Sequence, residues 1–175
     1  GKETVKMSKR AGDFITASEV LEEVGKDAFR FFLLSQRSQT HMDFDLELAK
    51  KKASDNPVFY VQYAYTRIQS IFKKSEGSFN GANLILLNSK EEIELIRKLL
   101  VFPSLVEEVY KELEVNSLTT YALELSGLFH KFYEANQVIS EDKDLTNARL
   151  ALLKATEVTL KNTLDLLGIS TPSEM

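Results

Sequence analysis

Cysteine is absent from this chain of 175 residues, which excludes disulfides and thiolate metal sites. Proline and glycine are scarce, with 3 and 7 residues, and this argues against a loop-rich or repetitive protein. No hydrophobic run approaches the roughly 20 residues that cross a bilayer, and the polar start of the chain has no apolar segment typical of a secretory signal. We therefore expect no membrane partner and a cytoplasmic location, which the lack of cysteine also fits.

The chain also lacks an excess of positive charge. Its 22 Lys and Arg residues face 26 Asp and Glu residues, which gives a net charge of −4. Proteins that hold nucleic acid without sequence preference are usually basic, because neutralising phosphates drives that binding. If this chain binds RNA, a local face must do so, and reading a few exposed bases is favoured over holding a long backbone.

Helical signals, in contrast, run through almost the whole sequence. Thr16 and Glu19 form a capping-box pattern that opens a helix, Gly25 is expected to end it, and Asp27 is expected to cap a second helix. Only residues 14–15 suggest a short strand. The sequence predicts an all-α fold, a bundle of five or more helices. Beyond the first two, the expected helices cover about 45–53, 57–74, 91–113, 117–139 and 147–167.

The expected helix over 57–74 has the clearest pattern. Pro57 suits its first turn, with Asp55 or Asn56 as cap. Hydrophobic residues spaced 3, 4, 3 and 4 apart predict its buried face, which comprises Val58, Val61, Tyr65, Ile68 and Phe72.

The later helices have weaker signals at their ends. Pro103 is expected to kink or break the 91–113 pattern, whose inward face runs to Leu113. Ser117 is the expected cap of the next helix, whose inward face is expected to reach Ile139.

The opposite face of the 57–74 helix is unusual. Solvated helix faces mostly carry Lys and Glu, whereas this one carries Tyr60, Tyr63 and Arg67. Flat rings beside a cation suit unstacked RNA bases, and stacking on an aromatic ring is worth roughly 1–3 kcal/mol per base. The residues alone slightly favour a plainer interpretation, in which these tyrosines pack beneath the first helices with their hydroxyls at the surface. His41 and His130 have no partners at zinc-binding spacing, and His130 is expected at a helix surface.

The string Lys6-Met7-Ser8-Lys9-Arg10 resembles the lysine-rich signature loop of class I aminoacyl-tRNA synthetases, although many members have serine where Arg10 stands. The motifs that follow strengthen the likeness and, in this order, resemble bacterial-type arginyl-tRNA synthetases over essentially the whole chain. The long match over 56–64 favours the arginyl over the cysteinyl enzymes. The matching segments are 23–34, 41–46, 56–64, 147–150 and 166–169.

The resemblance implies a C-terminal fragment with two parts. Residues 1–54 would be the end of a catalytic domain with its signature loop and linker helices, and residues 55–175 would be an anticodon-binding helical bundle. The full-length enzyme would join L-arginine to tRNA-Arg with ATP and Mg²⁺, and it would be a monomer. The fragment alone is expected to be inactive and to hold no cofactor. A helical protein-interaction module and a cysteinyl-tRNA synthetase fragment are the alternatives.

The resemblance also implies site residues. Lys6 and Lys9 would be catalytic, because ammonium groups stabilise the charge that develops on a pyrophosphate leaving group. The ATP-binding residues would be Lys6, Met7, Ser8, Lys9 and Arg10. The tRNA-binding residues would be Tyr63, Arg67, Tyr133, Asn136 and Met175. No protein-bound metal site is expected.

Overall fold

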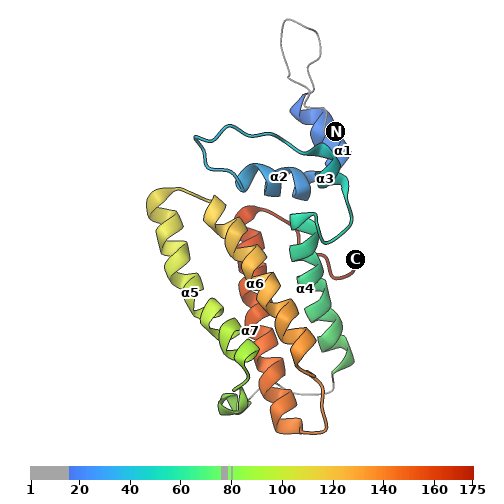
Figure 1. The fold of residues 1–175 in the computed structure, drawn as a ribbon, viewed down its shortest axis with the longest axis vertical. Coiled ribbons are helices and arrows are strands. Elements are labelled where there is room, and N and C mark those ends of the chain that lie inside the picture. Colours follow the sequence, from blue (N-terminus) through green and yellow to red (C-terminus); the bar gives the residue numbers. More distant parts are fainter. Residues whose placement is uncertain (1–15, 76–78, 80) are drawn as a thin grey trace, which may run out of the picture.

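The computed structural model describes residues 16–75, 79 and 81–175. These residues form helices and loops without a strand, so the all-α prediction is confirmed, whereas the possible strand at 14–15 lies outside the described residues. Helices α4 to α7 run side by side as an elongated bundle, and α1 to α3 form a small layer at one end (Figure 1). The helices are α1 Ala17–Val24, α2 Lys26–Leu34, α3 Leu46–Lys50, α4 Pro57–Lys74, α5 Lys90–Glu112, α6 Asn116–Ala135 and α7 Lys143–Leu167, with a 3-10 turn, η1, at Leu84–Leu86.

The first two helices meet at Gly25. The capping box is present, because Thr16 Oγ1 accepts from the Glu19 amide at 3.2 Å while Glu19 Oε2 accepts from the Thr16 amide at 2.6 Å. Gly25 ends α1 with a φ of +81° and also precedes α2, so the prediction that Asp27 caps α2 is wrong. Asp27 lies in the first turn of α2, and its carboxylate instead accepts from Gln62 Nε2 at 2.8 Å and from the Ser170 amide at 3.1 Å.

Helix α4 has the bounds that the sequence predicts. Asn56 is its cap, since Asn56 Oδ1 accepts from the Val58 amide at 3.2 Å. The side-chain nitrogen of Asn56, Nδ2, donates to the carbonyls of Ala49 and Lys51, at 3.1 and 2.7 Å, and so joins α3 to α4. Of the predicted inward face, four residues are buried and Phe72 packs against the core from a half-buried position.

Helix α5 continues through Pro103, so the break expected there is wrong. Proline removes one backbone donor from the helix. The Tyr121 hydroxyl of α6 donates to the Lys98 carbonyl of α5 at 3.0 Å and so ties these two helices together. Leu113 is not inward, as it ends α5 in the left-handed region with a φ of +58° and is 81% exposed.

The ends of α6 and α7 differ from the sequence prediction. Ser117 is not the cap of α6, because its hydroxyl donates to the Glu114 carbonyl at 2.9 Å and the helix begins one residue earlier. Ile139 lies beyond the end of α6 and is exposed. Helix α7 begins at Lys143 rather than 147, since Asp142 caps it by accepting from two amides. Its predicted end is confirmed at Gly168, with a φ of +66°.

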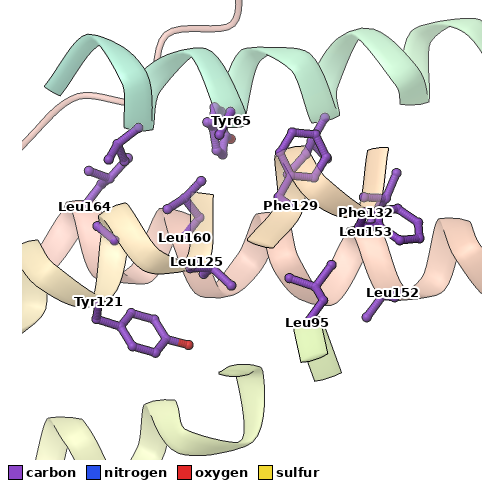
Figure 2. Close-up of a cluster of buried hydrophobic side chains, with 14 of the residues drawn as sticks. Tyr65, Leu95, Tyr121, Leu125, Phe129, Phe132, Leu152, Leu153, Leu160 and Leu164 are labelled. Carbon is purple, nitrogen blue, oxygen red and sulfur yellow. The ribbon is translucent and has the colours of Figure 1, made fainter. Parts of the chain in front are cut away.

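The core lies between α4, α5, α6 and α7 and contains leucine and aromatic side chains from all four (Figure 2). Burying such side chains contributes roughly 1.5–3 kcal/mol each. Fully enclosed members are Ile68, Leu95, Leu125, Phe129, Phe132, Leu153, Leu160 and Leu164.

The segment after α7 runs back along α4. Arg30 Nε donates to the Leu167 carbonyl at 2.9 Å, which ties α2 to the end of α7. Thr66 Oγ1 then donates to the Pro172 carbonyl at 3.2 Å, and Lys73 pairs with Glu174 at 2.9 Å. The segment therefore lies along α4 from Gln62 to Lys73, and the C-terminus is beside this helix (Figure 1). Among the described residues, no helix combines the length and apolar character needed to cross a bilayer.

Candidate nucleic-acid interface

Side chains with rings, and one arginine, from α4 and α6 meet along one side of the bundle. On each helix they recur at intervals of three or four residues, which places them on one face. We call this set the aromatic strip. It consists of Phe59, Tyr60, Tyr63 and Arg67 from α4, and Phe129, His130 and Tyr133 from α6.

Arg67 and Tyr133 form one end of the aromatic strip. The Arg67 guanidinium carbon lies 4.8 Å from the centroid of the Tyr133 ring, and Nη2 donates to the Tyr133 hydroxyl at 3.1 Å. Within the described part of the chain, Arg67 forms no ion pair. The structure thus brings together two of the residues predicted to bind tRNA, and it leaves a positive charge there without a carboxylate partner.

Tyr63 is the most exposed ring of the aromatic strip, at 42%. Its ring is nearly parallel to that of Phe59, with centroids 6.5 Å apart, and it stacks on His130 at 5.8 Å. The Tyr63 hydroxyl has no hydrogen bond to another described residue. A flat ring and an unused hydroxyl are therefore presented to solvent, so Tyr63 does not pack beneath the first helices.

Tyr60 is half-buried against α6. Its ring lies 4.9 Å from that of His130, and its hydroxyl approaches Gly127. Burial raises the pKa of the Tyr60 hydroxyl, and the negative charge of Glu134 raises it further. Tyr60 supports the aromatic strip from within.

His130 is partly buried on the face of α6 that meets α4. It is not an ordinary surface residue, because its ring packs against Tyr60, Tyr63 and Phe129, the last at 5.2 Å. Nε2 of His130 is buried and has no hydrogen-bond partner. Burial lowers the pKa of His130; the nearby carboxylate of Glu134 acts in the opposite direction, and the charge of Arg67 lowers the pKa further. The only signal in the sequence was its place between two aromatic residues of α6.

Asn136 follows the aromatic strip at the end of α6, where its side-chain amide is used within the fold. Its Nδ2 donates to the Phe132 carbonyl at 3.1 Å, and its Oδ1 accepts from Arg149 Nη2 at 3.0 Å. Arg149 in turn bonds Glu92 Oε1 at 2.7 Å. The structure thus fixes Asn136 at the turn into α7, one helical turn from Tyr133, and its contact with tRNA stays a prediction.

Met175 lies apart from the other predicted tRNA-binding residues. It is 52% exposed and lines a groove of about 630 Å³ between α2, α3 and the start of α4. Phe59 lines the same groove and stacks on Tyr63, so it connects Met175 to the aromatic strip. Lys26 and residues 50–52 also line this groove, where Lys50 pairs with Glu23 and Lys51 pairs with Asp55 at 2.6 Å.

The remaining predicted site residues, Lys6, Met7, Ser8, Lys9 and Arg10, lie outside the described residues. Across the described ranges, no group of three or more His, Cys, Asp or Glu side chains could hold a metal ion.

The model of the DALR anticodon binding domain matches residues 61–175, which include the aromatic strip from Tyr63 onward. The chain belongs to this family. The chain is also 48% identical over 177 residues to a protein named arginine–tRNA ligase from Citrifermentans bemidjiense. The match covers 98% of the chain and 32% of that relative. A relative of the same name from Moorella thermoacetica is 42% identical over 181 residues, which is 100% of the chain and again 32% of the relative.

Solved structures give the same family. A putative arginyl-tRNA synthetase from Campylobacter jejuni superimposes with a TM-score of 0.85 and 31% identity, covering 98% of the DALR chain and 37% of that structure. Arginyl-tRNA synthetase from Thermus thermophilus gives a TM-score of 0.76 and 28% identity, with 95% and 29% covered. The DALR chain thus spans about a third of the length of its curated relatives. These comparisons do not support the interaction-module or cysteinyl alternatives.

Proposed function

We propose that the aromatic strip binds the anticodon loop of a tRNA for arginine. The observation that carries this proposal is the exposed ring of Tyr63 beside an Arg67 without a carboxylate partner, within a domain of the DALR anticodon-binding family. Anticodon bases are single-stranded, so they are free to stack on such rings. The names of the relatives, which specify arginine, supply the choice of tRNA.

The chemistry of the aromatic strip suits this ligand. Base stacking on an aromatic ring tolerates any base and contributes roughly 1–3 kcal/mol per base. The Arg67 guanidinium lies against Tyr133 and is held in a fixed direction, where it can meet a phosphate or a base edge. Since the net charge of the chain is −4, such a local cation is needed for a polyanion to approach.

The whole protein is then an aminoacyl-tRNA ligase for arginine, as its relatives are named. In this proposal residues 1–54 belong to the end of the catalytic domain, and the bundle from residue 55 binds tRNA-Arg. The resemblance of residues 6–10 to the signature loop supports ATP binding with Mg²⁺ by the whole enzyme, in the cytoplasm and as a monomer.

Replacing Tyr63 with alanine tests the proposed interface. We expect the Kd for tRNA-Arg to rise roughly 5- to 150-fold, because one stacking partner worth about 1–3 kcal/mol is removed. Binding is measured with tRNA-Arg and with the same tRNA carrying a changed middle anticodon base, across a salt series. Tyr110→Ala is the matched control, since Tyr110 is an 81% exposed tyrosine on α5, away from the aromatic strip.

The salt series separates base reading from phosphate attraction. Selective loss of binding to the altered anticodon, with a shallow salt dependence, supports the proposal. Equal binding of both RNAs with a steep salt dependence contradicts it, because only phosphates are then bound. A Tyr110→Ala chain that weakens binding as much as Tyr63→Ala contradicts the location.

A further inference from the structure

His130 Nε2 is the one buried side-chain nitrogen or oxygen, among the residues that the structure describes, that has no hydrogen-bond partner. Such atoms are rare in folded proteins, because burial without a partner costs free energy. The three rings around His130 come from Tyr60, Tyr63 and Phe129. A phenylalanine would fill a space lined by rings without that cost, so packing alone does not account for a histidine here.

The ring that covers His130 from the solvent side is held weakly. Tyr63 stacks on His130 and on Phe59, and no described residue bonds its hydroxyl. Its ring is 42% exposed, so turning it outward breaks two ring contacts and no hydrogen bond. Because the same ring is the proposed stacking platform, an incoming base reaches Tyr63 first and His130 directly behind it.

We propose that His130 is a specificity-determining residue, whose Nε2 hydrogen-bonds to the edge of an unstacked RNA base once Tyr63 moves to stack on that base. This inference rests on the proposed function and deepens it. A neutral imidazole has one N–H donor and one acceptor nitrogen, so Nε2 offers a base edge either a donor or an acceptor but not both. That single choice distinguishes bases, whereas the stack on Tyr63 does not.

The charges around His130 favour the neutral ring that this role needs. Arg67 on α4 opposes a second positive charge, and burial opposes any charge, while Glu134 on α6 favours protonation. The other groups that face the ring, Tyr60 and Tyr63, are neutral aromatic side chains. At pH 7 the imidazole therefore remains neutral, because its pKa is below the ordinary value of 6.5.

His130→Phe tests the inference, because the substitution keeps a ring in place and removes the hydrogen-bonding nitrogen. We expect the ratio of Kd values for the altered and the natural anticodon to fall about tenfold, since one hydrogen bond to the base is lost. The urea midpoint is expected to equal or exceed that of the unsubstituted chain. His41→Phe is the matched control, because His41 is the other histidine of the chain and its side chain is 95% exposed.

A pH series checks that the buried ring behaves as described. The folded pKa of His130 is lowered, so below about pH 6.5 the unfolded chain binds the proton more readily and the folded state loses stability as the pH falls. This loss is expected to disappear in His130→Phe and to persist in His41→Phe, as measured by urea midpoints between pH 7.5 and pH 5. A parallel test follows the ¹⁵N signals of the two histidines as tRNA-Arg is added, and only the His130 signal should shift.

The outcomes separate this inference from the proposed function. If the unsubstituted chain does not distinguish the two anticodons, the proposed function fails and the inference with it. If it distinguishes them and His130→Phe does so equally well, only the inference is overturned. A folded His130→Phe chain that binds both RNAs more weakly by the same factor shows a purely structural role and also overturns the inference, as does an unmoved His130 signal.

Discussion

Glu92→Ala is expected to lower the free energy of unfolding by about 3–5 kcal/mol, because removing one partner of a buried ion pair leaves the other charge uncompensated. Glu92 is 1% exposed, and its carboxylate serves three partners. Oε1 accepts from Arg149 Nε at 2.7 Å, and Oε2 accepts from the amides of Asn88 and Ser89, each at 2.8 Å. The substitution thus removes the side-chain half of the capping box of α5 and the link between α5 and α7 together.

Urea unfolding at pH 7 measures this loss, and Asp165→Ala is the control. Asp165 pairs with Lys161 at 2.6 Å, but both side chains are about half exposed, so no measurable loss is expected there. A Glu92→Ala chain as stable as the Asp165→Ala chain contradicts the prediction.

At acid pH, the difference in the free energy of unfolding between Glu92→Ala and the unsubstituted chain should become smaller. Burial acts to raise the pKa of Glu92, but the bonds from Ser89 and the Arg149 charge outweigh it and lower the pKa below 4.5. A carboxyl group with a lowered folded pKa stabilises the fold above its unfolded pKa, and this contribution is lost as the pH falls further. The difference in the free energy of unfolding is therefore expected to narrow below about pH 4.5.

Gly168→Ala is expected to lower the free energy of unfolding by about 2–4 kcal/mol. Part of the cost, roughly 1–2 kcal/mol, arises because Gly168 has a φ of +66°, where a side chain is strained. The rest arises because a Cβ atom there would lie 2.9 Å from Arg30 Nη2 and 3.0 Å from Nε. The guanidinium would have to move away, and its bond to the Leu167 carbonyl would be lost.

Gly81→Ala separates the two parts of this cost. Gly81 has a φ of +73°, but a Cβ atom there would meet nothing within 4 Å, so only the backbone strain applies. In thermal unfolding, the melting temperature should decrease more for Gly168→Ala than for Gly81→Ala. Equal decreases would show that the Arg30 contact adds nothing.

The sequence predicted those helices whose ends carry local signals. Helix α4 was placed correctly because Asn56, Pro57 and a regular hydrophobic spacing all agree. The start of α7 was missed because the charged residues around Asp142 look like a turn, so the role of Asp142 as a cap was not recognised. The role of Asp27 was missed for a different reason, since its partner Ser170 is 143 residues away in the chain.

The candidate site shows the same limit. Helical spacing placed Tyr63 and Arg67 on one face, away from the core. That Arg67 meets Tyr133, 66 residues later, depends on how α4 packs against α6, which spacing within one helix does not determine. The ring contacts of His130 could not be predicted because its neighbours Tyr60 and Tyr63 belong to the other helix.

The bond between Asp27 and Ser170 has a consequence for synthesis of the chain. Translation adds about 5–20 residues per second, so the 143 residues between them take roughly 7–29 s to appear after Asp27. Until then the Asp27 carboxylate has Gln62 as a partner but not Ser170, and α2 lacks the Leu167 carbonyl that Arg30 binds. Phe31 of α2, which is fully enclosed in the finished fold, therefore stays without its neighbours from α6 and α7 until those helices have been synthesised.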